Sequence, residues 1–183
     1  GFHYARRNES NVRAIAMMEA FLMAVPSWDA FPDSAREIFQ AFRTEDVGWK
    51  LIATENVFVE QVLPGSVVRD LTEAEMDVYR APYPTEQSRK PLWRWPNEIP
   101  IEGEPEDVEE IVLSYNAWLQ ETELPMLLFH GKPGALVPPP VVGWVQQNVT
   151  NVETVDVESC IHFVQEDHPH EIGRGIADWL GRG

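Results

Sequence analysis

The feature that most constrains the fold is a short run of apolar residues at 14–18 (AIAMM), which shows no alternation with polar residues. A run of this length and composition is typical of a parallel β-strand buried on both faces. Residues 124–129 (LPMLLF) predict a second buried strand and residues 152–157 (VETVDV) a third, with a helix at residues 141–147 between them. Strand, helix and strand in that order imply a right-handed parallel crossover. The sequence therefore predicts an α/β fold built on a mainly parallel sheet.

The region between the first two predicted strands differs in character, because its aromatic-rich helical segments are broken by prolines. We expect a core segment at residues 1–20, an inserted helical lobe at residues 21–103 and a second core segment at residues 104–183. Residues 1–8 (GFHYARRN) read as the later turns of a helix, so the chain is expected to begin within an element. Inside the lobe, Thr72 and Glu75 predict a capping box. The proline-rich residues 89–105 predict an ordered connection without regular structure.

The composition limits the classes of partner. The 183 residues carry a formal net charge of −16, which opposes binding to nucleic acid or to an anionic membrane surface, so a neutral small molecule is the expected partner. Cys160 is the single cysteine, which excludes an internal disulfide and indicates a reducing compartment. No apolar run approaches the roughly 20 residues of a membrane-spanning helix. These features together predict a cytoplasmic protein.

Two side chains that follow predicted strands are candidates for a shared active site. Glu19 directly follows the first strand, and His162 follows the third, ahead of a helix whose first turn contains Pro169. Ligands of open α/β sheets bind outside the carboxyl ends of the strands, where both residues are expected. A histidine oriented by a carboxylate can act as a general base, and such a pair forms two members of a catalytic triad. The alternative is structural: His162 packs beneath the last helix and Glu19 caps a helix.

Other residues allow less specific interpretations. His130 follows the second predicted strand and is expected in another loop at the same edge of the sheet. His168 and His170, close to Glu166 and Asp167, suggest a metal site, but acidic and polar residues are also expected where a helix begins. Aromatic residues of the lobe suggest either an apolar pocket or an ordinary core; they are Phe21, Trp28, Phe31, Phe39 and Phe58.

Several segments, taken in order, carry a resemblance to a known family. They are MEAF, PSWDAFP, FQAFRTEDVG, NVFVEQVLP, LTEAEMDVYRAP, PNEIPIEGEP, GKPGALVPP and IHFVQEDHPHEIG. These segments resemble the haloalkane dehalogenases of the α/β-hydrolase fold. The resemblance runs from Gly1 to near Leu180 and corresponds to the later part of the family's chain. It implies the C-terminal half of a mainly parallel α/β-hydrolase sheet with an inserted helical cap.

By this resemblance, His162 matches the family's catalytic base and Glu19 its catalytic acid. The loop after the second predicted strand contains no carboxylate, which fits the subgroup that carries its acid at the position of Glu19. Positions that line the family's substrate cavity are matched by Phe31, Phe39, Phe58, Val62, Leu136 and Ile161, and a cap proline near the halide is matched by Pro96. The sequence departs from the family at Ser159-Cys160, where a glycine is usual, and has one extra residue between Glu19 and Trp28.

The resemblance also implies a reaction that needs no metal or organic cofactor. In the family an aspartate displaces halide from an alkyl carbon, and the histidine then activates water to hydrolyse the alkyl-enzyme ester. The family's nucleophile lies upstream of the position that matches Gly1, and no aspartate of this chain is at a predicted strand-to-helix elbow. The expected partners are therefore a small haloalkane, water, halide ion and the N-terminal half of the enzyme. Alternatives are a coelenterazine luciferase, an epoxide hydrolase that uses Tyr79 and Tyr83, or a non-catalytic binding module.

Overall fold

The computed structural model describes residues 1–182, apart from the side chain of Ser34, and the chain separates into two units. The sheet unit comprises Gly1–Met23 and Glu110–Gly183, and the helical unit comprises Ala24–Glu109. None of the helices within residues 1–182 combines the length and the apolar composition needed to cross a bilayer.

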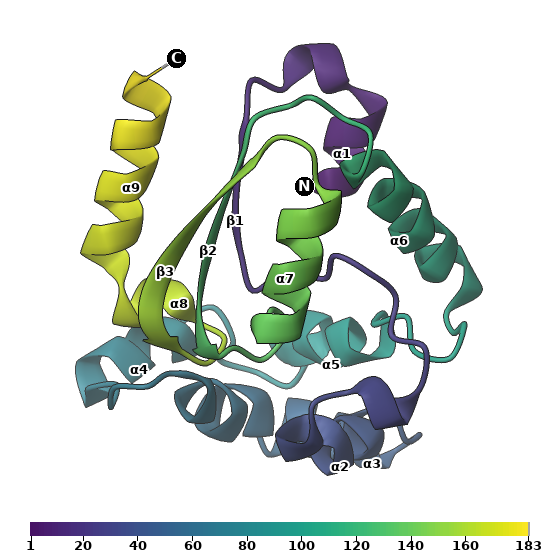
Figure 1. Cartoon of the computed structure of the whole chain (residues 1–183). Helices are drawn as coiled ribbons and strands as arrows, with labels where there is room; N and C mark the ends of the chain where they lie inside the picture. Colours follow the sequence, from purple (N-terminus) through teal and green to yellow (C-terminus); the bar gives the residue numbers. More distant parts are fainter. Residues whose placement is uncertain (183) are drawn as a thin grey trace. The chain divides into compact units, whose positions relative to one another are not determined.

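The sheet unit is built on parallel strands in the order β1–β2–β3, which lie side by side in Figure 1. The strands are β1 (Ile15–Met18), β2 (Met126–Pro133) and β3 (Val152–Cys160). In the register of the sheet, Ile15 lies opposite Met126, and Met126 lies opposite Val152. Helix α7 (Pro139–Asn148) connects β2 to β3. The predicted parallel strands and the helix of their crossover are therefore confirmed. The prediction that the first strand is buried on both faces is wrong for the described residues, because Ala16 of β1 is exposed and only Met17 is buried.

Strand β2 is longer than the sequence predicts, and this corrects the position of one histidine. The strand continues to Pro133, so His130 lies within it, opposite Asp156 of β3, and not in a loop. The register shifts between His130 and Lys132, where the ladder is irregular. Pairing with β3 extends β2 through residues of low strand propensity, because their backbone groups find partners in the sheet.

Helix α9 (Pro169–Gly181) packs against the sheet through a buried apolar cluster. Leu127 and Phe129 of β2 share this cluster with Ile172 and Trp179 of α9. A Cβ atom at Gly175 would lie 2.8 Å from Cε1 of Phe129, so the glycine allows the helix to approach the strand closely. Figure 1 shows α9 and α7 on opposite sides of the strands. The predicted start of this helix at Pro169 is confirmed.

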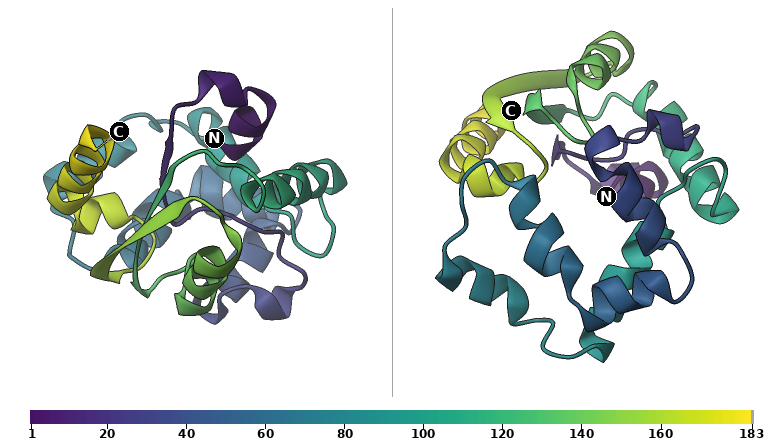
Figure 2. Two further views of the ribbon diagram at one scale, coloured as in Figure 1. Left: turned by 45° about the horizontal axis from the view of Figure 1, so that its top comes forward. Right: turned by 90° about the horizontal axis from the view of Figure 1, so that it is seen from below.

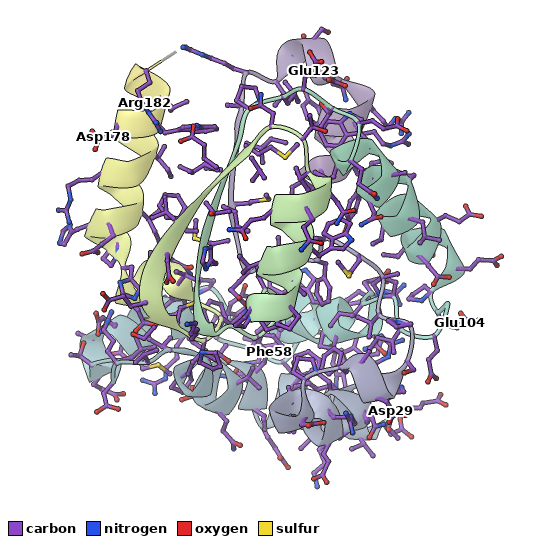
Figure 3. All side chains as sticks on the ribbon, in the orientation of Figure 1. Asp29, Phe58, Glu104, Glu123, Asp178 and Arg182 are labelled. Atoms are coloured by element: carbon purple, nitrogen blue, oxygen red, sulfur yellow. The ribbon has the colours of Figure 1, made fainter. Side chains whose placement is uncertain are left out.

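The N-terminal segment of the sheet unit is attached to α6 (Glu106–Leu119) and to the turn after it. This segment forms α1 (Phe2–Arg7) and η1 (Glu9–Asn11). The Glu9 carboxylate accepts hydrogen bonds from Trp118 Nε1 at 2.9 Å and from Thr122 Oγ1 at 2.8 Å. These bonds lower the pKa of Glu9. Directly after α9, Arg182, labelled in Figure 3, donates to Glu153 of β3 at 2.8 Å.

The helical unit consists of short helices joined by turns, which Figure 2 shows from two directions. Its elements are η2 (Trp28–Ala30), α2 (Asp33–Phe42), α3 (Val47–Trp49), η3 (Lys50–Thr54), η4 (Phe58–Val62), η5 (Pro64–Ser66), α4 (Glu73–Arg80), η6 (Gln87–Arg89) and α5 (Lys90–Asn97). The turns η3 and η4 are π-helical. The predicted capping box of α4 is confirmed: Glu75 N donates to Thr72 Oγ1 at 3.3 Å, and Thr72 N donates to Glu75 Oε2 at 2.7 Å.

The prediction that residues 89–105 lack regular structure is wrong for their first half, because α5 occupies Lys90–Asn97. Pro91 lies in the first turn of this helix, where a missing N–H removes no helical hydrogen bond. Pro96 lies near its end. The chain after α5 is irregular, with isolated bridges that join Ile101 to Val25 and to Glu104.

Candidate active site

Glu19 follows β1 directly and has a backbone conformation that is unusual for a residue with a side chain. Its φ angle is +41°, in the left-handed region. Its side chain is only 3 % exposed. A strained backbone persists only where the surrounding structure holds it, and such residues cluster at functional sites. The conformation of Glu19 therefore marks the end of β1 as a candidate site.

Three backbone N–H groups of the turn after β2 hold the Glu19 carboxylate. Ala135 N and Leu136 N donate to Oε2 at 3.0 and 2.7 Å, and Val137 N donates to Oε1 at 3.1 Å. Burying an ionised carboxylate is costly unless hydrogen bonds replace its water. The turn supplies that replacement and fixes the orientation of the carboxylate. Its donors precede α7, so the alternative that Glu19 caps a helix does not hold here.

The imidazole of His162 lies against the same carboxylate. Its Nδ1 atom is 3.3 Å from Glu19 Oε2, and the side chain is 34 % exposed. His162 lies in the loop between β3 and α8 (Val164–Asp167), and the ring of Phe163 packs edge-on against it with centroids 5.0 Å apart. A carboxylate at Nδ1 favours the tautomer with the proton on that atom and leaves the lone pair of Nε2 free to accept a proton. The proximity expected from the two strand ends is therefore present.

Cys160, the last residue of β3, is fully buried close to this pair. Burial raises the pKa of its thiol to about 11, and the negative charge of Glu19 contributes in the same direction. The thiolate is the reactive form of cysteine, so the neutral thiol of Cys160 is not suited to act as a nucleophile. The chemistry available within this site is that of a base and its orienting acid.

The turn that holds Glu19 is also bonded to the end of β3. Gly134 N donates to the carbonyl of Cys160 at 3.1 Å, and Ala135 N donates to the carbonyl of Ile161 at 2.9 Å. These backbone donors were not predicted from the sequence. The Pro133-Gly134 dipeptide is a recognised turn signal, but it does not indicate which carboxylate the turn will bind.

The remaining histidines do not assemble a metal site. His168 Nε2 is 2.6 Å from the carbonyl of Ser159, which makes that nitrogen a hydrogen-bond donor. His170 is exposed in the first turn of α9. Among the residues that the structure describes, no group of three or more His, Cys, Asp or Glu side chains is arranged to hold a metal ion.

Three residues of the helical unit that were expected at cavity positions, Phe31, Phe39 and Phe58, belong to a row of aromatic rings. The ring centroids of Phe31 and Phe39 are 5.2 Å apart, and Phe42 links Phe39 to Phe58 with centroid distances of 5.5 and 6.0 Å. Phe42 is fully buried and belongs to the core. Phe58, labelled in Figure 3, and Val62 both lie on η4 and are half-buried. Pro96 is buried within α5.

The two cavity-matching residues of the sheet unit lie beside the Glu19–His162 pair. Leu136 is half-buried and donates its N–H to Glu19. Ile161 is half-buried, precedes His162 and contributes its carbonyl to the same turn. Both residues therefore have a backbone role that is separate from any contact of their side chains with a ligand.

No family model matches the sequence of this chain, but individual proteins do. A haloalkane dehalogenase of Mesorhizobium japonicum is 46% identical over 181 residues, which cover 98% of this chain and 58% of that protein. A haloalkane dehalogenase of Sphingobium indicum is 42% identical over 185 residues, which cover 100% of this chain and 60% of that protein. The chain thus spans about three fifths of the length of the curated relatives that it matches.

Solved structures agree with these relatives. The haloalkane dehalogenase DbeA from Bradyrhizobium elkani has a TM-score of 0.95 and 43% identity, and the match covers 98% of this chain and 62% of that one. The haloalkane dehalogenase DatA from Agrobacterium tumefaciens has a TM-score of 0.90 and 29% identity, with 100% and 62% covered. These likenesses assign the chain to the α/β-hydrolase fold. Within that fold it is a homologue of the haloalkane dehalogenases over its whole length.

Proposed function

We propose that this chain is the part of a haloalkane dehalogenase that carries the catalytic base and acid. The complete enzyme would hydrolyse the carbon–halogen bond of a haloalkane to an alcohol and halide. The observation that carries the proposal is the hydrogen-bonded pair of His162 and the buried Glu19 carboxylate at the carboxyl ends of β3 and β1. The relatives are haloalkane dehalogenases, which supports the choice of carbon–halogen bonds among the reactions of this fold.

The first step of the proposed reaction needs a nucleophile that we assign to polypeptide outside these residues. None of the described strands β1, β2 and β3 is followed directly by an aspartate, since the next residues are Glu19, Gly134 and Ile161. An aspartate carboxylate would attack the alkyl carbon, and halide would leave with the electron pair of the broken bond. The product of this step is an alkyl ester on the enzyme. The N-terminal half of the enzyme is thus the proposed partner of this chain.

The second step uses the pair described above. Nε2 of His162 would take a proton from water while the water oxygen attacks the ester carbonyl. The Glu19 carboxylate would stabilise the imidazolium that forms, and its three amide donors hold the carboxylate in position. Collapse of the tetrahedral intermediate would break the bond to the alkoxide oxygen, which would take the proton from His162 and leave as the alcohol. The aspartic acid that remains would lose the second proton of the water to solvent and become a carboxylate again.

Substrate contacts are proposed for the apolar residues that match the family's cavity. We assign the helical unit as the cap of the enzyme. The residues proposed to contact the substrate are Phe31, Phe39, Phe58, Val62 and Pro96 of the helical unit, and Leu136 and Ile161 of the sheet unit. Their apolar side chains suit an uncharged haloalkane and would keep bulk water from the reacting carbon. The protein groups that the proposed reaction uses are a carboxylate and an imidazole, and its co-substrate is water.

The cytoplasmic location predicted from the single cysteine stays a prediction.

The test is a substitution of His162 in the full-length protein that contains these residues. His162→Phe removes the base and keeps a ring of similar size, so halide displacement should still occur once per enzyme while turnover falls by about 100-fold or more. Mass spectrometry after incubation with a haloalkane should detect the accumulated alkyl ester. His170→Phe, at an exposed position on α9, is the matched control and should turn over normally. A folded His162→Phe enzyme with no alkyl adduct, or with normal turnover, would contradict the proposal.

A further inference from the structure

One turn connects both members of the candidate catalytic pair. The N–H of Ala135 is shared between Glu19 Oε2 at 3.0 Å and the carbonyl of Ile161 at 2.9 Å. The preceding N–H, of Gly134, donates to the carbonyl of Cys160 at 3.1 Å. Cys160 and Ile161 directly precede His162, so the turn is bonded on one side to the acid and on the other to the segment that carries the base. A movement of this turn would change the position of both.

Gly134 is the residue that allows the turn to adopt this shape. Its φ angle is +66°, a conformation that residues with side chains rarely adopt. A Cβ atom at this position would lie 2.7 Å from the carbonyl oxygen of Val137 and 3.2 Å from that of Gly131. Both neighbours are backbone atoms, which cannot rotate away as the end of a side chain can. The N–H of Val137, on the other side of its Cα atom, donates to Glu19 Oε1, so displacing Val137 would remove or bend one of the bonds that hold the acid.

We propose that Gly134 is a positioning residue for the hydrolytic step. By leaving room for the Val137 peptide, it aligns the amide donors on Glu19, and the carboxylate in turn holds His162 in the tautomer with the proton on Nδ1. The roles of Glu19 and His162 in this inference rest on the proposed function. Only hydrolysis of the alkyl ester uses the base, so loss of the alignment should slow that step and spare halide displacement.

The direct test is Gly134→Ala in the full-length protein labelled with ¹⁵N-histidine. The ¹⁵N chemical shifts of the His162 ring report which nitrogen carries the proton. We expect the wild-type ring to show the Nδ1–H tautomer and the variant to lose this preference. Gly143→Ala is the matched control, because Gly143 lies in α7 and a Cβ atom there would meet nothing within 4 Å. The control should keep the wild-type tautomer.

Kinetics of the same variants separate positioning from a general loss of structure. A catalytic group displaced by an ångström can lose about 100-fold in rate, so ester hydrolysis in Gly134→Ala should fall by about that factor. The halide burst should remain, and the alkyl ester should accumulate. Equal losses in both steps with an unchanged His162 tautomer would show that Gly134 is merely structural and would overturn the inference.

A reciprocal measurement decides the question if Gly134→Ala does not fold. Glu19→Gln replaces one carboxylate oxygen by a donor, so at least one amide of the turn loses its acceptor. Hydrogen exchange at the amides of Ala135, Leu136 and Val137 should become faster, while exchange at the amides within α7 stays the same. Unchanged exchange at all three amides would show that the turn and the carboxylate do not hold each other.

The outcomes for the positioning role and for the proposed function can be told apart. If the full-length protein releases no halide from a panel of haloalkanes but Gly134→Ala still changes the His162 tautomer, the proposed function is wrong and the positioning role stands. If halide release is normal and folded Gly134→Ala matches the wild type in tautomer and in hydrolysis, the positioning role is wrong and the proposed function stands.

Discussion

The two units of this molecule connect distant parts of the chain in different ways. In the sheet unit, β1, β2 and β3 are joined by backbone hydrogen bonds of a parallel ladder. In the helical unit, residues 24–109 contain no named strand, and arginine side chains reach between elements to backbone carbonyls. Arg43 of this unit donates to the carbonyls of Pro96, Ile99 and Glu104 at 2.8, 2.6 and 3.1 Å. The guanidinium group of Arg43 thus donates hydrogen bonds to backbone carbonyls, as the N–H groups of a neighbouring strand do in a sheet.

Arg89 of the helical unit also binds backbone carbonyls of other segments through its guanidinium group. Arg89 donates to the carbonyls of Tyr83 at 3.0 Å and Ala53 at 2.8 Å. Burial lowers the pKa of Arg43, whose guanidinium also lies 5.8 Å from the ring centroid of Trp28. The comparison indicates that arginine side chains connect separate elements of the helical unit, whereas a backbone ladder connects the strands of the sheet unit. The candidate catalytic pair lies in the unit whose strands are joined by backbone pairing.

The largest expected effect is a loss of unfolding free energy when the apolar packing of the sheet unit is disrupted. Phe129→Ala removes a fully buried ring from the cluster between β2 and α9, and large-to-small substitutions of this kind cost about 3–5 kcal/mol of unfolding free energy. Urea denaturation of the full-length protein measures the change. Val78→Ala, at a side chain that is 72% exposed, is the control and should change the free energy by less than about 0.5 kcal/mol. Similar effects of the two changes would show that the cluster does not stabilise the unit.

An intermediate effect is expected for the arginine contacts of the helical unit. Arg43→Met keeps much of the apolar stem and removes the donors to three carbonyls, so we expect a loss of about 1–3 kcal/mol in unfolding free energy. Arg94→Met is the matched control: Arg94 is 62% exposed and forms an exposed ion pair with Glu98, so the loss of unfolding free energy should be below about 0.5 kcal/mol. Chemical denaturation compares the two. Equal losses would remove the distinction drawn here between the units.

The smallest expected effect is a dependence of the stability of the helical unit on pH. Hydrogen bonds from the Arg69 guanidinium, and then from the Thr72 backbone, lower the pKa of Glu75 from 4.5 to about 2. A carboxyl group whose pKa is depressed on folding stabilises the folded state above its unfolded pKa. This contribution should be lost progressively as the pH falls from 4.5 towards about 2. Glu75→Gln should be less stable than the wild type at neutral pH, and the difference should shrink across that interval.

Denaturation curves of the wild type and Glu75→Gln at several pH values measure this dependence. Glu73→Gln is the control, because Glu73 lies in the same first turn of α4 with a side chain that is 78% exposed. A difference between wild type and Glu75→Gln that stays constant down to pH 2 would contradict the assignment.

Features that depend on residues close together in the sequence were predicted better than features that depend on pairing between distant segments. The capping box at Thr72 and Glu75 was predicted correctly, because its partners are three residues apart and determine each other's geometry. The helix α5 was missed, since its prolines suggested a break although Pro91 lies where proline is tolerated. His130 was placed in a loop because its neighbours have low strand propensity, but pairing with β3 overrides that propensity.

By itself, the sequence determined that a glutamate and a histidine would each follow a parallel strand, because apolar runs and helix-start signals act within a few residues. Only the tertiary structure decided that Nδ1 of His162 lies 3.3 Å from Glu19, a residue 143 positions earlier in the chain. It also decided the left-handed backbone of Glu19 and the binding of its carboxylate to the amides of residues 135–137. These features depend on the register of three strands and on the shape of a turn. Hydrogen bonds between backbone groups distant in sequence leave no pattern in the side chains, so the sequence does not contain a local signal for them.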